Sequence, residues 1–269
     1  MVFLTNTRQY PTMNEILAQL LTTQIFVLAM VFCRLGSAMI LMPGFGESVI
    51  PIRFRLLFGF SFTILLAPFL VKQIPPQPTE VASLFLLLGG EIFVGLFIGV
   101  LMRTMLAALD IAATIMSDIN GLSSASIFNP LIATQGSAIG VFLAGLAMVL
   151  LFVTGLHEQM IRALVESYSL FIPGQLPPLG DFSKTVVEFT GRSFRIGFQL
   201  AAPTVVIITL MMVGLGVIAR LVPQLQVFFV SQPLQIAAGL LILLVGLPTM
   251  MLTFMSAFSD ALALLLNPQ

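Results

Sequence analysis

Residues 83–102 read SLFLLLGGEIFVGLFIGVLM, and this stretch decides the fold class. It contains a single charged side chain, Glu91, and about 20 apolar residues in an α-helix are enough to cross a bilayer core. Since backbone groups in lipid must be paired within the segment, the stretch predicts a transmembrane helix. Gly95 and Gly99 have the four-residue spacing that lets two membrane helices approach closely, so we expect tight packing there.

Similar apolar runs lie on both sides of this stretch, and we predict six or seven spans in one integral membrane domain, residues 1–269. Glycine and proline mark the ends of the runs, as at Pro43-Gly44 and at Asn120-Gly121. The proline-rich stretch 167–183 is predicted to be the longest non-helical connection. The predicted runs are residues 16–42, 56–71, 83–102, its helical continuation 104–119, 138–156, 198–219 and 234–258.

The overall composition supports the same class of protein. Hydrophobic residues make up 58% of the 269 residues, charged residues make up 8%, and the mean hydropathy is +1.10. Ordinary soluble domains contain roughly 25% charged residues, so a soluble protein is excluded. Eleven basic and eleven acidic residues balance to zero, which predicts no nucleic-acid partner. We therefore expect an all-α protein of helical hairpins that crosses the inner membrane several times.

Four charged side chains fall inside predicted spans: Arg34, Glu91, Asp110 and Asp118. A charge in hydrocarbon is costly unless it is paired, so each is a candidate functional residue. Asp110 and Asp118 are separated by eight residues, roughly 80° around a helix, and could both point into one bundle interior. A proton or cation pathway is one interpretation. The interpretation that we favour is that each carboxylate pairs with Arg34, Arg103 or a backbone amide and locks the helices together.

The sequence contains no recognisable machinery for enzyme chemistry. His157 is the only histidine and Cys33 the only cysteine, so we predict no metal site and no disulfide. Motifs of the H-E-x-x-H, G-x-S-x-G, G-x-G-x-x-G and Walker types are absent. We therefore predict no catalytic residue, no cofactor and no enzymatic activity.

Residues 121–130 read GLSSASIFNP, and two apolar side chains stand in this loop among small neighbours. Small residues allow a segment to move, and apolar tips can seal a narrow opening. If the loop lies over a pore, it could plug that pore. The candidate plug residues are Ser123, Ser124, Ala125, Ser126, Ile127 and Phe128.

Three local patterns together resemble the type III secretion export-gate family, which has a flagellar branch and an injectisome branch. The first pattern is Arg34 with Pro43 and Gly44 in the turn that follows, and the second runs from Asp118 through residues 121–130. The third pattern is the most specific, and it departs from its relatives at Gln226, where asparagine is more frequent. Its residues are Pro223, Gln224, Gln226, Phe228 and Pro233.

The resemblance implies a core subunit of the flagellar export gate, packed into a larger helical assembly at the flagellar basal body. It also implies a loop in the position of residues 121–130 that helps to close the channel. The implied partners are the sister gate proteins FliP and FliQ, the export-apparatus proteins FlhB and FlhA, and unfolded flagellar export substrates. An injectisome subunit is the alternative within the family. A small-solute or ion transporter that uses Glu91, Asp110 and Asp118 is the rival from another class.

Overall fold

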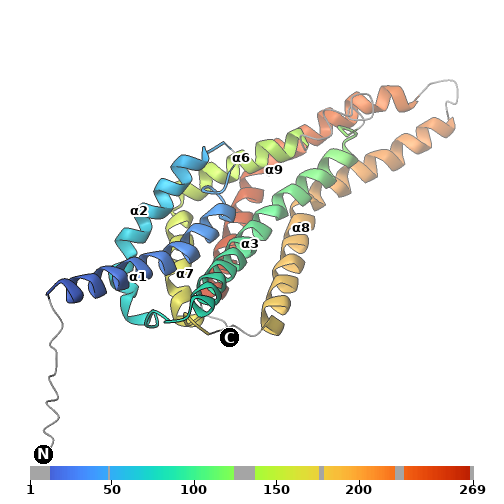
Figure 1. Cartoon of the computed structure of the whole chain (residues 1–269). Helices are drawn as coiled ribbons and strands as arrows, with labels where there is room; N and C mark the ends of the chain where they lie inside the picture. Colours follow the sequence, from blue (N-terminus) through green and yellow to red (C-terminus); the bar gives the residue numbers. More distant parts are fainter. Residues whose placement is uncertain (1–12, 48, 124–136, 176–178, 222–226, 267–269) are drawn as a thin grey trace, which may run out of the picture.

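The computed structural model describes residues 13–47, 49–123, 137–175, 179–221 and 227–266, and these ranges are helical apart from short connections (Figure 1). None of the described residues forms a β-strand, which confirms the predicted all-α class. The elements are α1 (Met13–Leu41), α2 (Ile52–Leu70), the 3₁₀ turn η1 (Val71–Gln73), α3 (Val81–Ile119), α6 (Ala138–Val153), α7 (Leu156–Leu170), α8 (Leu179–Leu221) and α9 (Val227–Leu266).

Helix α3 lies at the centre of the fold and packs most extensively against α1 and α8, with α6 and α9 on its second half. Glycines allow these crossings. A Cβ atom on Gly95 would collide with the backbone of Arg34 in α1, and one on Gly99 would lie 2.9 Å from the Ala38 carbonyl oxygen. The predicted close packing at Gly95 and Gly99 is therefore confirmed, with α1 as the partner helix. Gly197 plays the same part in α8, against the Ala108 carbonyl oxygen.

The turn between α1 and α2 forms at the predicted Pro43-Gly44 position. Gly44 has φ +85°, a left-handed conformation that a glycine adopts without strain. The amides of Phe45 and Gly46 both donate to the Met42 carbonyl at the end of α1. Arg55 then reaches back from α2 and donates to the Glu47 carbonyl at 2.7 Å. The turn is thereby tied to the first turns of α2.

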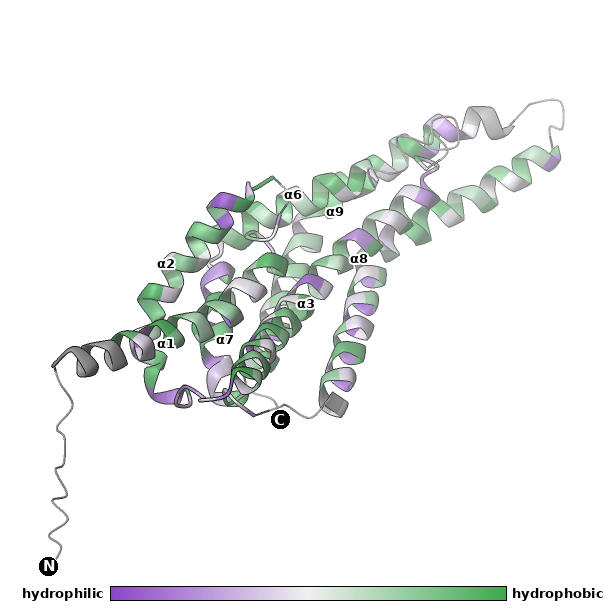
Figure 2. Cartoon of the chain, viewed as in Figure 1, coloured by the Kyte–Doolittle hydropathy of each residue, from purple (hydrophilic) through white to green (hydrophobic). Residues whose placement is uncertain are grey.

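Three helices are much longer than a bilayer core about 30 Å thick. At about 1.5 Å per residue, the 39 residues of α3, the 43 of α8 and the 40 of α9 each extend well beyond it. Figure 1 shows the second part of α8 and the first part of α9 side by side, extending away from the other helices as an antiparallel hairpin. Hydrophobic residues predominate along this hairpin (Figure 2).

Among the described residues, five helices are long and apolar enough to cross a membrane, or six if the bent pair α6–α7 counts as one span. The sequence predicted six or seven. The difference arises because residues 83–102 and 104–119 form the single helix α3. The bend of 74° between α6 and α7 occurs at Gly155, whose φ of +74° ends one helix and starts the next.

Two predictions for the region around the start of α8 are wrong. The stretch 167–183 is not one long connection, because α7 continues to Leu170 and α8 starts at Leu179. Likewise, α8 starts 19 residues before the predicted run 198–219. Its early part is amphipathic and carries the i,i+4 pair Glu188–Arg192 at 2.7 Å, so charged residues do not end the helix. Pro173 lies in the break between α7 and α8.

Candidate functional site

Among the charged side chains that the structure describes, Arg34 is the most buried, and it lies where α1, α3 and α7 meet. Its Nε donates to Glu91 Oε2 at 2.7 Å and its Nη2 donates to Glu91 Oε1 at 3.0 Å. Its Nη1 donates to the Ser167 carbonyl at 3.2 Å, and Nη2 also donates to the Phe171 carbonyl at 2.9 Å. The guanidinium carbon lies 4.0 Å from the centre of the Tyr168 ring. Arg34 is 0% exposed, so this charge is fully enclosed.

This arrangement satisfies groups that would otherwise be costly to bury. The fork of a guanidinium matches the two oxygens of a carboxylate, so Arg34 and Glu91 neutralise each other with good geometry. The carbonyls of Ser167 and Phe171 lie at the end of α7, where the helix dipole attracts a positive charge. The Ser167 carbonyl also accepts the backbone N–H of Phe171 at 2.8 Å. Arg34 of α1 therefore binds Glu91 of α3, which lies 57 residues further along the sequence, and Ser167 of α7, which lies 133 residues further along.

The expectation that Asp110 and Asp118 point into the interior of this chain is wrong. Both side chains are on the exposed side of α3. The expected partner Arg103 instead forms an ion pair with Glu47, from the connection between α1 and α2. Of the predicted intramembrane charges, only Arg34 and Glu91 are brought together by the described helices. The sequence missed Glu47 because it was assigned to a loop and not to a helix contact.

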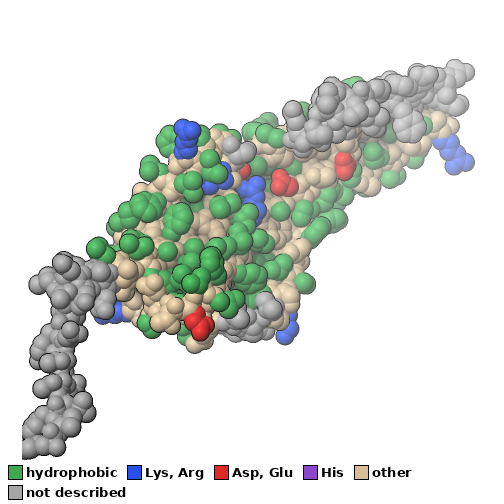
Figure 3. Space-filling view, viewed as in Figure 1, with side chains coloured by type: hydrophobic (Ala, Val, Ile, Leu, Met, Phe, Trp, Pro, Cys, Tyr) green, Lys and Arg blue, Asp and Glu red, His purple; other side chains and the backbone are tan. Residues whose placement is uncertain are grey.

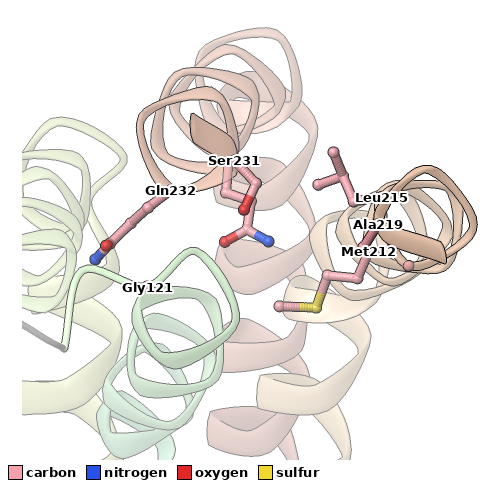
Figure 4. Close-up of a pocket in the computed structure, with 8 residues that line it drawn as sticks. Gly121, Met212, Leu215, Ala219, Ser231 and Gln232 are labelled. Carbon is pink, nitrogen blue, oxygen red and sulfur yellow. The ribbon is translucent and has the colours of Figure 1, made fainter. Parts of the chain in front are cut away.

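A second polar region lies where α3 ends against α8 and α9. A pocket of about 330 Å³ is bounded there by Gly121, by Met212 and Leu215 of α8, and by Ser231 and Gln232 of α9 (Figure 4). Its remaining lining residues are Gly216, Ala219 and Gln235. Gly121 also has φ +75°, so the chain turns sharply as α3 ends. The pocket therefore lies at the start of the candidate plug segment.

Asn120 immediately precedes the lining residue Gly121, and 1% of its surface is exposed. Sequence reasoning missed its role. Its carboxamide fills the space in which a Cβ atom of Gly239 would lie, so α9 packs directly against the end of α3. Neither amide atom of Asn120 has a hydrogen-bond partner within the described chain. The signal that could have indicated this contact is the glycine in the middle of the apolar run 234–258.

Several predicted site residues cannot be placed. Of the candidate plug, Ser123 follows Gly121 in the turn after α3, whereas Ser124, Ala125, Ser126, Ile127 and Phe128 lie outside the described residues. Of the third family pattern, Pro223, Gln224 and Gln226 also lie outside them, as does the side chain of Phe228 in α9. Pro233 is exposed within α9, and Pro43 and Gly44 are buried in their turn.

The described side chains contain no group of three or more histidine, cysteine or carboxylate residues that could hold a metal ion. His157 packs against the ring of Phe152 with ring centres 5.1 Å apart, at the bend between α6 and α7. Cys33 is a free, partly buried thiol of α1. The chemistry that the described residues offer is therefore ion pairing and helix packing.

Comparison with known proteins identifies the family. The model of "Bacterial export proteins, family 1" matches residues 25–261. This chain belongs to that family. It is 33% identical to the flagellar biosynthetic protein FliR of Caulobacter vibrioides, over 89% of this chain and 95% of that protein. It is 30% identical to FliR of Bacillus subtilis, over 86% and 89%. It is also 30% identical to the Yop proteins translocation protein T of Yersinia pestis, over 76% and 78%.

Membership in bacterial export protein family 1 makes the chain a multi-pass inner-membrane component of a type III export apparatus. The matched region starts inside α1 and ends near the end of α9, so it includes both polar regions described above. The resemblance inferred from the three local patterns is thus confirmed at the level of the family. Ser167 and Tyr168 were missed because the sequence placed them in a non-helical connection.

Proposed function

We propose that this chain is a core membrane subunit of a flagellar type III export gate, which helps to form and close the channel for unfolded flagellar proteins. The observation that carries the proposal is the 33% identity to a flagellar protein over 89% of this chain and 95% of that protein. An injectisome subunit is the second candidate, supported by 30% identity to the Yersinia protein. The higher sequence identity to the Caulobacter protein, 33% against 30%, favours the flagellar assignment.

The shape of the molecule supports a role inside a larger helical assembly. Long apolar helices that extend past their neighbours leave much of their surface uncovered within the chain. Val213 of α8 and Leu244 of α9 are 62% and 72% exposed, respectively. In the proposed gate, the sister subunits FliP and FliQ cover part of this surface, and FlhB and FlhA act on the assembly. A subunit without its own nucleotide motif requires energy from such partners.

The segment after α3 supports the proposed closing role. Gly121 starts that segment. The end of α3 that precedes it is packed against α9 through the contact between Asn120 and Gly239. A short run of small residues with two apolar tips, anchored on a rigid helix end, suits a plug that excludes ions when no substrate is present. We propose that residues 123–128 serve as this plug.

Deletion of the gene in its own organism, followed by complementation, tests the function. We expect loss of swimming in soft agar and loss of flagellin from the culture medium, with both restored by the tagged wild-type chain. Recovery of that tagged chain in mild detergent together with other export-gate proteins supports the gate. Normal motility with loss of effector secretion would instead indicate the injectisome. A stable, solitary chain that binds a solute would favour the transporter.

A further inference from the structure

The exposed side of α3 changes character along the helix. Over its first half the exposed side chains are large and apolar, as at Phe85, Leu86 and Ile92. Over its second half they include Arg103, Asp110, Thr114 and Asp118. Hydrophobic side chains cover large parts of the described surface visible in Figure 3, and few charged groups lie among them. Arg103 is paired with Glu47, but contacts within the described chain do not explain why Asp110 and Asp118 lie on this polar stripe.

Asp110 stands at the edge of a groove between α3 and α8. The groove has a volume of about 470 Å³, and apart from Asp110 and Thr114 its walls are apolar. The side chains of Ile111 and Ile115 belong to α3, and the rings of Phe194 and Phe198 belong to α8. Both rings remain about 60% exposed, so the groove is open on the outside of the chain.

The Asp110 carboxylate has no ion pair or hydrogen bond to any group in the described part of the chain. Arg103 is close enough to act on it electrostatically, but the guanidinium of Arg103 is paired with Glu47. On α8, Arg192 is paired with Glu188. A carboxylate within a membrane helix is costly unless it is paired or faces water. Because no cation of the described chain is paired with Asp110, a neighbouring subunit is the source of counter-charge that this groove suggests.

An arginine or lysine side chain is complementary to this groove. Such a side chain has a long apolar stem and a cationic tip. The stem matches the isoleucine and phenylalanine walls, and the tip matches the single carboxylate at the edge. Arginine also stacks favourably on aromatic rings. A free metal ion would find one carboxylate and one hydroxyl, which is too few ligands.

We propose that the groove between α3 and α8 receives a basic side chain from a membrane helix of a neighbouring subunit, with its cation on Asp110. This inference rests on the proposed function, because it requires a neighbour in the export gate. It adds the contact that holds this face of α3 in the assembly. In the competing arrangement, water in the channel solvates the Asp110 carboxylate. The experiments below distinguish a basic side chain from channel water at this position.

The first experiment compares the tagged full-length chain with its Asp110→Arg and Asp110→Asn variants in the native membrane. Asp110→Arg places two cations in the groove, so we expect the recovery of co-purified gate subunits to fall by about tenfold. Asp110→Asn keeps the shape and removes the charge, and we expect a smaller loss. Asp260→Asn, at an exposed carboxylate near the end of α9, is the matched control and should leave recovery unchanged. Wild-type recovery for both Asp110 variants would overturn the proposal.

The second experiment introduces a photoreactive benzoylphenylalanine at Phe198, in the groove, and at Val187, an exposed α8 position outside it. We expect an adduct from position 198 to a subunit peptide that contains arginine or lysine, and none to that peptide from position 187. Adducts to lipid alone from position 198 would overturn the proposal. If the wild-type chain recovers no other subunit at all, the proposed function itself fails.

The third experiment tests for channel water, using Thr114→Cys in a Cys33→Ala background. In the assembled complex, we expect the thiol at position 114 to be protected from a membrane-impermeant maleimide. In the isolated chain in detergent it should react. Rapid labelling in the assembled complex would show that the groove faces water, and this outcome would also overturn the proposal.

Discussion

Gly239 packs directly against the carboxamide of Asn120, so that the Asn120 side chain occupies the space in which a Cβ atom of residue 239 would lie. The contact joins the end of α3 to the middle of α9 at the point where the candidate plug segment starts. Within the described structure, neither side-chain amide atom of Asn120 has a hydrogen-bond partner. Shape alone therefore holds this junction, which makes it sensitive to added volume.

Replacing Gly239 with alanine should destabilise the junction. The new methyl group has no room beside the Asn120 side chain, and overpacking of a buried contact costs roughly 1–3 kcal/mol. We expect a lower apparent melting temperature of the purified chain in mild detergent, measured by intrinsic tyrosine fluorescence or by aggregation. The matched control is Gly89→Ala, because a Cβ atom there meets nothing within 4 Å. Equal melting temperatures for the two variants would contradict the close packing.

Breaking the buried ion pair should be more damaging than breaking an exposed one. Glu91→Gln or Arg34→Met leaves the other charge buried without its counter-charge, which costs roughly 3–5 kcal/mol. Arg192→Met removes a partly exposed i,i+4 pair and should cost about 0.5 kcal/mol or less. Thermal unfolding in one detergent compares all three variants.

The double variant Arg34→Met with Glu91→Leu refines this test. Because no uncompensated charge remains buried, it should be more stable than either single variant of the pair. The carbonyl of Phe171 still loses the Arg34 donor and the carbonyl of Ser167 keeps only the backbone N–H of Phe171, so wild-type stability is not expected. A double variant less stable than both single variants would show that the pair is not the main interaction at this site.

Deleting residues 123–128 should make cells permeable to small ions, if these residues plug the channel. The measurement is the growth rate and membrane potential of cells that contain the assembled mutant complex. Phe128→Ser with Ile127→Ser removes only the apolar tips and should give part of the same leak. Ser61→Ala, at an exposed position of α2, is the control and should remain tight. Unchanged permeability with a fully assembled deletion variant would refute the plug.

Polar substitutions on the exposed apolar surface of α8 and α9 should weaken assembly. Val213→Asn and Leu244→Asn each place an amide on a surface that is more than half exposed in the isolated chain. We expect reduced recovery of other gate subunits and a normal amount of membrane-inserted chain. Val187→Asn, on the amphipathic early part of α8, is the control. A loss of inserted chain without a change in subunit ratio would mean that lipid, not protein, covers this surface.

Much of the fold could be predicted from local sequence. The ends of α1 and α3, the continuation of α3 past residue 102, and the close approach at Gly95 and Gly99 all follow from residues near one another in the chain. The early part of α8 could not be predicted from hydropathy. Its charged residues are distributed along one side of a helix that continues into the apolar part, and a hydropathy window averages over both sides.

The sequence by itself determined the class of protein, the approximate spans and the family. These depend on composition, on apolar runs and on short motifs, all of which are local properties. Only the tertiary structure decided that Arg34 pairs with Glu91 across 57 residues, that Arg103 pairs with Glu47, and that Asp110 is left on the outside. Such pairings depend on where helices cross and how each is rotated about its axis, and helix rotation is set by packing along the whole interface.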